Sequence, residues 1–194
     1  MNNKYKIVAL FGEAGSGKDY IQKKIMETDF GKKNLSEIIS CTTRPPREGE
    51  IDGVHYHFIS EEEFFSETWL EFTEFRGWYY GTPITKLKRD KINIGVFNIA
   101  GIYTILKNKN IECLPIYIKT YPKIRLLRQL QRENEPNCDE IVRRYMTDQK
   151  DFLKIPFHHY IIENNYDEIQ HIINDLSHLI KEEFSISIKE KWTK

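Results

Sequence analysis

The sequence has few cysteines, and their spacing suits neither a disulfide framework nor a zinc site. There are three, Cys41, Cys113 and Cys138, and no two of them form a CxxC pair. An odd number of scattered cysteines argues against both kinds of cross-link. No apolar run approaches the length of a membrane span, and the opening "MNNKYKIVALFG" is too short and too quickly interrupted for a signal peptide. These absences predict a cytoplasmic protein in a reducing environment, without a membrane partner.

The chain also has no excess of charge of either sign. Its 29 Lys and Arg residues balance 29 Asp and Glu residues, so the formal net charge is zero. Without a basic field to attract nucleic acid, we expect no nucleic-acid partner, and any bound anion must be held by a local cluster. What remains is a chain of 194 residues with a hydrophobic fraction of 40%. That length and composition predict one soluble domain with a sizeable core.

The stretch "FGEAGSGKDY" (Phe11–Tyr20) has the Gly-x4-Gly-Lys spacing of a phosphate-binding loop. A short apolar run, Lys6–Phe11, precedes it and predicts a buried strand. Helical spacing follows from Asp19 to Thr28. Strand, glycine loop and helix in this order are the context that a phosphate loop requires. We therefore expect the loop to bind the phosphates of ATP through Gly12, Glu13, Ala14, Gly15, Ser16, Gly17, Lys18 and Asp19.

Asp19 departs from the pattern, which has a Ser or Thr there to hold Mg²⁺. One interpretation makes its carboxylate a metal ligand, since Mg²⁺ takes oxygen ligands and usually only one or two carboxylates. The other makes it an acid in the first turn of a helix, stabilised by the helix dipole. The residues leave both interpretations open.

The rest of the chain alternates strands and helices around one segment of different character. Residues 41 to 85 are rich in turn formers and alternating aromatics, which predicts a small sheet inserted into an α/β core. Within it, Ser60 and Glu63 form a capping-box pattern and predict a short helix. Further buried strands are predicted at Ile92–Gly101, Ile111–Thr120 and His158–Asn165, and helices near Ile102–Leu106, over Pro122–Phe152 with a break, and over Asp167–Phe184.

Two arginine clusters are candidates for phosphate binding. Arg44 and Arg47 flank Pro45-Pro46, which holds the backbone extended, and Tyr56 and Tyr80 offer hydroxyl groups to the same phosphate monoester. The alternative is a solvated charged turn. The second cluster, on two predicted helical arms, fits a lid that folds over a triphosphate, or a solvated helix with ion pairs four residues apart. Its members are Arg125, Arg128, Arg132, Arg143 and Arg144.

The phosphate loop, "SCTTRPPREGEIDGVHYHF" and "EFTEFRGWYYGT" together resemble the guanylate kinase family, across roughly Ile7 to Asn165. The resemblance implies an α/β P-loop kinase fold, with helices on both faces of a parallel core sheet. It also implies a mixed-sheet insert that binds a nucleoside monophosphate and a helical lid. The implied boundaries are about 1–40, 86–124 and 153–194 for the core, 41–85 for the insert and 125–152 for the lid.

The resemblance also implies roles for individual residues. Lys18, Arg44, Arg132 and Arg144 would act on the transferring phosphoryl group, and Arg128 and Asn164 would contact ATP. Asn98, at the end of a predicted core strand, would lie at the GMP site. The acceptor phosphate would be bound by Arg44, Arg47, Tyr56 and Tyr80, and the base would be read by Ser40, Glu71 and Thr82.

The chain departs from the family at the end of its third predicted core strand. Val96 and Asn98 stand where the family usually has aspartates. If Asp19 binds Mg²⁺, a carboxylate lost from the strand end has been regained in the phosphate loop.

The resemblance implies transfer of a phosphoryl group from ATP, with Mg²⁺ as cofactor, to GMP or dGMP by a monomer or homodimer. A broader deoxynucleoside monophosphate kinase is the alternative, because Asn98 could loosen base selection. A ribose-bisphosphate kinase is less expected, since the base readers Glu71 and Thr82 are present. A non-catalytic binding module is disfavoured because the phosphate loop and lid arginines are kept.

Overall fold

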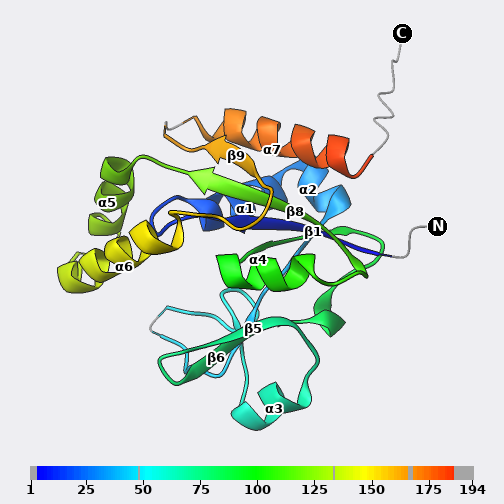
Figure 1. Ribbon diagram of the computed structural model, residues 1–194, viewed down its shortest axis with the longest axis horizontal. Coiled ribbons are helices and arrows are strands. Elements are labelled where there is room, and N and C mark those ends of the chain that lie inside the picture. The colour runs from blue at the N-terminus through cyan, green and yellow to red at the C-terminus, as the bar shows by residue number, and fades with distance from the viewer. Residues whose placement is uncertain (1–3, 48, 133, 166–167, 186–194) are drawn as a thin grey trace.

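The strand that leads into the phosphate loop, β1 (Tyr5–Phe11), lies at the centre of the molecule (Figure 1). The computed structural model of the protein describes residues 4–47, 49–132, 134–165 and 168–185. Side chains from Ile7 to Phe11 are fully buried. They are apolar on both sides because the strand pairs with parallel neighbours and is covered on both faces. The predicted strand is confirmed.

Five parallel strands form the core sheet in the order β2-β7-β1-β8-β9. Because the chain crosses from one side of β1 to the other between β7 and β8, the carboxyl ends of these strands form the edge where ligands bind in open α/β sheets. The three-residue strand β2 follows a helix directly and shows no period of its own, so the sequence did not reveal it. The strands flanking β1 are β2 (Leu35–Glu37), β7 (Ile92–Val96), β8 (Ile111–Lys119) and β9 (Tyr160–Glu163).

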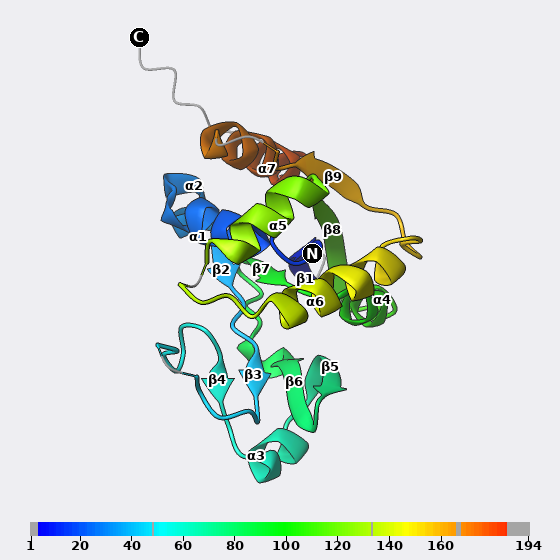
Figure 2. The same ribbon diagram turned by 90° about the vertical axis from the view of Figure 1, so that its left-hand side faces the viewer.

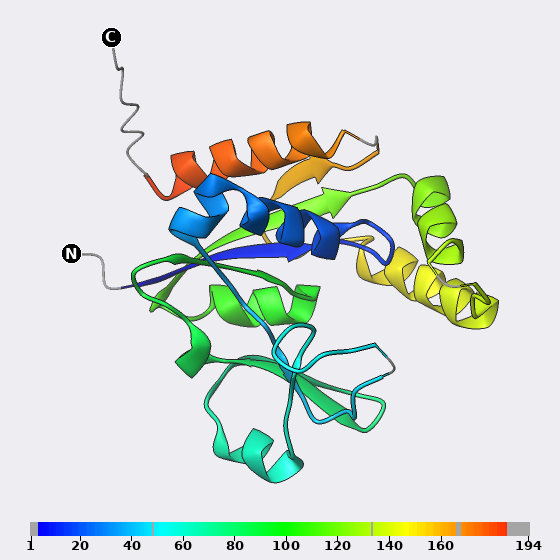
Figure 3. The same ribbon diagram turned by 180° about the vertical axis from the view of Figure 1, so that it is seen from behind.

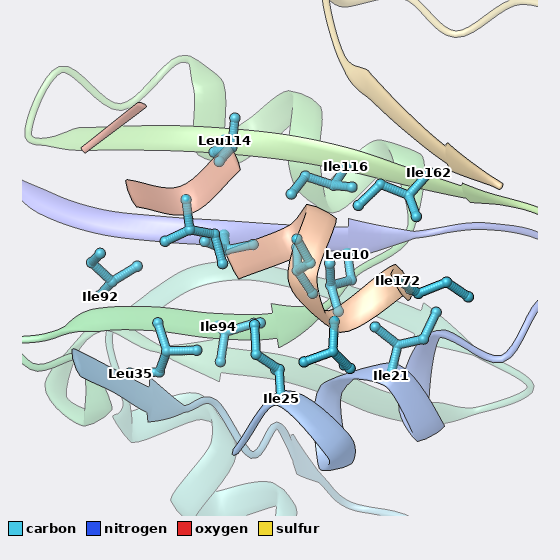
Figure 4. Packing of buried hydrophobic residues seen from close by; sticks show 14 of the residues in the cluster. Leu10, Ile21, Ile25, Leu35, Ile92, Ile94, Leu114, Ile116, Ile162 and Ile172 are labelled. Atoms are coloured by element: carbon cyan, nitrogen blue, oxygen red, sulfur yellow. The ribbon is translucent and has the colours of Figure 1, made fainter. Parts of the chain in front are cut away.

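Helices cover both faces of this sheet, as expected (Figures 1 and 3). One face packs against α1 (Lys18–Glu27), α2 (Asp29–Asn34) and α7 (Ile169–Glu183), and the other against α4 (Ile99–Leu106). Alternation along β1 divides its side chains between the two cores, since successive strand residues point to opposite faces. Figure 4 shows the first core, in which Leu10, Ile94 and Ile116 of the sheet meet Ile21 and Ile172 of the helices.

A second, four-stranded sheet in the order β4-β3-β6-β5 forms the insert. It is mixed, because β3 and β4 are parallel while β6 is antiparallel to β3 and β5. The predicted capping box is confirmed at Ser60 and Glu63, but β4 is shorter than the aromatic alternation indicated. The insert contains β3 (Cys41–Thr42), β4 (His57–Phe58), α3 (Glu61–Ser66), β5 (Trp69–Phe75), β6 (Trp78–Pro83) and a 3₁₀ turn (Ile84–Lys86).

Two helices, α5 (Pro122–Leu130) and α6 (Cys138–Asp151), lie beyond the carboxyl ends of the core strands (Figures 1 and 2). Arg132 was expected on a helical arm, and this is wrong, because α5 ends at Leu130 and Arg132 lies in the following loop. In the part of the chain that the structure describes, no helix combines the length and the apolar character that crossing a membrane requires. Asp167, expected to begin the last helix, and residues 1–3 and 186–194 of the expected core lie outside the described residues.

Candidate active site

The phosphate loop needs glycine for steric reasons at two positions. Gly15 and Gly17 have φ angles of 79° and 87°, in the left-handed region that side chains disfavour. A Cβ on Gly15 would lie 2.6 Å from the carbonyl oxygen of Arg125, and one on Gly17 would lie 2.5 Å from the side-chain nitrogen of Asn164. Gly17 caps α1 without a side-chain hydrogen bond. The amides at the helix N-terminus therefore remain available to an anion.

A cavity of about 440 Å³ opens above the loop and contains most of the residues expected to bind ATP. Glu13 and Ser16 are buried instead and do not line this cavity. Asn164 is also buried, and its amide donates to the carbonyl oxygen of Ser16 at 2.7 Å. It braces the loop, and its contact with adenine stays a prediction. The cavity is lined by Ala14, Gly15, Gly17, Lys18, Asp19, Arg128, Arg132 and Arg144, among others.

A second cavity, of about 320 Å³, lies between the insert and the end of β7. Ser40, Tyr56, Glu71, Tyr80 and Asn98 all line it, so the structure brings together these five residues from the expected GMP site. The structure therefore contains an acceptor-sized cavity separate from the one above the phosphate loop.

Glu71 is the buried charge of this second cavity. Burial raises the pKa of its carboxyl group, although hydrogen bonds from Thr82 act in the opposite direction. The Thr82 hydroxyl also lies 3.3 Å from that of Ser40. A carboxylate held in place by Thr82 is a selective acceptor for a ligand that offers N–H donors.

Arg44 and Arg47, also expected at the GMP site, are not among the residues that line this cavity, and they differ in exposure. Arg44 is buried, and its Nη2 lies 2.9 Å from each carboxylate oxygen of Glu50. Its guanidinium is 5.7 Å from the centre of the Tyr56 ring. Arg47 is exposed, and its backbone N–H donates to Glu50 at 2.7 Å. Glu50 thus orders the arginine loop, a role that we did not predict although "SCTTRPPREGE" contains it.

Two of the lid arginines are paired with a glutamate of their own helix, α6. Arg143 and Arg144 contact the two oxygens of Glu140 at 2.7 and 2.9 Å, and these bonds lower the pKa of the Glu140 carboxyl group. Arg76, at the tip of the β5–β6 hairpin, reaches the same carboxylate at 3.2 Å. In this state the ion-paired helix, one of the two interpretations of the cluster, describes Arg143 and Arg144.

Arg125 does not belong with the exposed lid arginines. Its side chain is 1% exposed and lies between two carboxylates, 3.6 Å from Glu13 and 3.5 Å from Asp148. The helical spacing of Arg125 and Arg128 did not separate a buried residue from a cavity residue, because the division depends on where the phosphate loop packs.

Asp19 and Asn98, the two departures from the family pattern, both lie at cavity walls. Asp19 is exposed in the first turn of α1. Burial, Tyr80 and the Asp19 charge raise the pKa of the Tyr56 phenol, whereas the Arg44 charge lowers it. Asn98 caps α4 by accepting from the Gly101 N–H at 2.7 Å. Among the described residues, no group of three or more His, Cys, Asp or Glu side chains could hold a metal.

A glycine loop at the carboxyl end of β1, followed by α1 and bordered by two separate cavities, is typical of a P-loop nucleotide-binding protein. The family model described as guanylate kinase matches residues 4–183. The guanylate kinase of Sulfurimonas denitrificans is 34% identical over 85% of this chain and 83% of its own length, and that of Helicobacter pylori strain J99 is 34% identical over 84% and 82%. The chain therefore belongs to the guanylate kinase family.

A solved structure of guanylate kinase from Anaplasma phagocytophilum has the same fold. Its TM-score is 0.64 at 18% identity, over 93% of this chain and 87% of the other. That likeness supports the fold class expected from the sequence.

We expect Arg47→Ala to weaken GMP binding much more than ATP binding. Loss of one charge-assisted phosphate contact should cost roughly 1.5–3 kcal/mol. Arg47 is the cleaner test than Arg44, since its side chain is exposed and leaves no buried partner. Calorimetric titration with each nucleotide measures the difference. The control is Lys33→Ala on α2, which removes an exposed positive charge away from both cavities. A selective loss of ATP affinity would show that the two sites are assigned the wrong way round.

Proposed function

We propose that this chain transfers the γ-phosphoryl group of ATP to GMP or dGMP, giving ADP and GDP or dGDP. The observation that carries this proposal is the buried Glu71 carboxylate in a cavity separate from the phosphate loop. A carboxylate accepts hydrogen bonds from both N1–H and the exocyclic amine of guanine. Adenine offers no such pair of donors on that edge. Ser40 and Thr82 complete the base site.

Catalysis rests on position and charge. Lys18 and the loop amides hold the donor phosphates, and Arg44, Arg47, Tyr56 and Tyr80 hold the acceptor phosphate. Arg132 and Arg144 supply positive charge to the migrating group from the lid. Phosphoryl transfer of this kind requires aligned reactants and neutralised oxygens rather than a covalent intermediate. For Arg144 to act, it must exchange Glu140 for a phosphate oxygen.

The residues around the loop fit Mg²⁺, which prefers oxygen ligands and keeps several waters. The Asp19 carboxylate lines the donor cavity beside Lys18, and ATP would bring further oxygens. Asp19 would hold the ion, which when bound neutralises phosphate charge. A single protein carboxylate agrees with the lack of a multi-ligand cluster among the described residues.

A broader deoxynucleoside monophosphate kinase is the second candidate. The specific observation in its favour is that Asn98, uncharged, lines the acceptor cavity together with Glu71. A non-catalytic binding module has no such support, since the loop glycines keep the conformation that phosphate binding needs.

ATP-dependent conversion of GMP, followed in a coupled assay, tests the proposal, with Lys18→Ala as the decisive variant. Lys18 would contact the β- and γ-phosphates, where charge accumulates, so its loss should lower kcat by about a hundredfold or more. Circular dichroism checks that the variant stays folded. Near-normal turnover in a folded Lys18→Ala protein would refute the assignment of the phosphate loop.

Glu71→Gln should reduce discrimination between GMP and AMP in kcat/KM by about tenfold or more. Glutamine keeps the size of the side chain but presents a donor to the donors of guanine, which leaves buried polar groups unpaired. The comparison of the two substrates measures this ratio directly. An unchanged ratio would mean that the base is read elsewhere.

The raised pKa of Glu71 adds a pH signature to the same variant. GMP needs the ionised carboxylate, so kcat/KM for GMP should fall as pH decreases through that pKa. Because burial raises the pKa, the fall should begin at a higher pH than for an exposed glutamate. Glu71→Gln should lack this acid limb.

Asp19→Ser should raise the Mg²⁺ concentration needed for half-maximal rate, if Asp19 replaces the missing strand-end carboxylates. Adding Asn98→Asp should recover much of the loss, and aspartate still caps α4. A Mg²⁺ titration of the wild type, both single variants and the double variant measures the coupling. A helix acid predicts instead a stability change of about 0.3–1 kcal/mol, an unchanged metal dependence and no rescue.

A further inference from the structure

Asp148, on the lid helix α6, forms a direct hydrogen bond with the phosphate loop. The backbone N–H of Ala14 donates to Asp148 Oδ2 at 2.8 Å. Amides of such loops are the donors that phosphate oxygens accept from. A carboxylate of the protein therefore takes the place of a phosphate oxygen at this amide. The contact joins residues 134 positions apart in the chain, and it brings α6 against the loop at the end of β1 (Figures 1 and 2).

The surroundings of this carboxylate are those of a bound anion. Asp148 lines two further cavities, of about 660 and 330 Å³, and Gly12 and Lys18 line both of them as well. Arg125 Nη1 lies 3.5 Å away. Burial and the Glu13 charge raise the pKa of the Asp148 carboxyl group, while the Ala14 N–H and the charges of Arg125 and Lys18 lower it. Its half-buried position among an amide and two cations reproduces the chemistry of a phosphate site.

A triphosphate at the loop conflicts with this arrangement. Phosphate oxygens near Lys18 would bring negative charge next to the Asp148 carboxylate and would compete with it for the Ala14 N–H. Like charges that lie next to each other repel strongly where water is partly excluded. Either the carboxylate withdraws or the nucleotide binds more weakly. Withdrawal moves α6, which also carries Arg144.

We propose that Asp148 is an internal competitor of the donor phosphates: it holds the lid helix α6 against the phosphate loop, and ATP displaces it. The proposal rests on the proposed function, since it concerns regulation of the same donor site. It explains why the helix that supplies Arg144 to the reaction contacts the loop through an acid. Displacement of that acid couples donor binding to release of the helix.

The alternative is that Asp148 is only an anchor that shapes the loop. The two interpretations predict opposite changes in ATP affinity for one substitution. Asp148→Asn keeps the shape and an acceptor oxygen but removes the charge. An internal competitor without charge competes less, so ATP affinity rises. A pure anchor that is weakened disorders the loop, so ATP affinity falls.

Binding of ATP and of inorganic tripolyphosphate, each without GMP, should be measured by calorimetry. If the docked state holds about nine-tenths of the molecules, Asp148→Asn should tighten both ligands by about tenfold, because apparent affinity scales with the competent fraction. The affinity for GMP should not change. The matched control is Asp151→Asn, which removes the same charge three residues further along α6. The Asp151 side chain is exposed and lines the larger of the two cavities that Asp148 lines. The control should change tripolyphosphate affinity by less than about twofold, since apparent affinity follows the population of the docked state, which it leaves alone.

A fluorophore on Cys138 gives a second readout that needs no change in affinity. Cys138 is exposed at the start of α6, whereas burial raises the pKa of Cys41 to about 11 and that of Cys113 to about 12, which keeps those thiols unreactive. Tripolyphosphate should shift the emission of the labelled wild type. Labelled Asp148→Asn should resemble the ligand-bound wild type before any ligand is added.

Unchanged or weaker tripolyphosphate binding by folded Asp148→Asn would overturn the proposal, as would an equal gain in Asp151→Asn. Both binding measurements are independent of GMP turnover. A chain that binds tripolyphosphate as expected but does not phosphorylate GMP would therefore refute the proposed function and leave the role of Asp148 standing.

Discussion

The burial of Arg125 is the constraint on which the arrangement of the active site depends. Its carbonyl oxygen occupies the space where a side chain on Gly15 would lie, and its guanidinium is enclosed between Glu13 and Asp148. Arg125 of α5 thereby packs against the phosphate loop and also contacts a carboxylate of α6. A buried guanidinium is tolerated only when its charge is compensated, and Glu13 of the loop compensates Arg125 whether or not α6 stays in place. Tyr117 extends the network by donating to Glu13 at 2.8 Å.

Other positively charged groups and one loop N–H are likewise paired with carboxylates of the protein. Arg44 is paired with Glu50, Arg144 with Glu140, and the Ala14 N–H with Asp148. These three groups, each suited to phosphate, are thus paired with the protein's own carboxylates. Binding then becomes an exchange of partners, in which each new contact contributes only its difference from the old one. This agrees with a chain whose positive and negative charges balance, and it makes nucleotide binding inseparable from rearrangement of the lid and the arginine loop.

Much of the site could be predicted from the sequence because its motifs are local. Three segments each contain their functional residues within about a dozen positions: the glycine loop, Ser40–Glu50 and the hairpin around Glu71. Patterns of that length can be recognised in the sequence without knowledge of the fold. The capping box at Ser60 is another local pattern that the structure confirms. The predictions that failed were those that required knowledge of packing. Arg132 lies past the end of its helix, and β2 is too short to show a period.

The sequence by itself predicted most of the core strands and helices and the phosphate loop, since each depends on residue types at short spacing, but it did not predict α2 and β2. Only the tertiary structure decided which charged side chains face the ligands and which are bound to one another. Arg125 and Arg128 are three residues apart on one helix, yet one is buried and the other lines the donor cavity. Likewise, Asp148 meets Ala14 across 134 residues. No local pattern encodes such a pairing, because the energy of a charge depends on its burial and its partners, and both are set by chain packing.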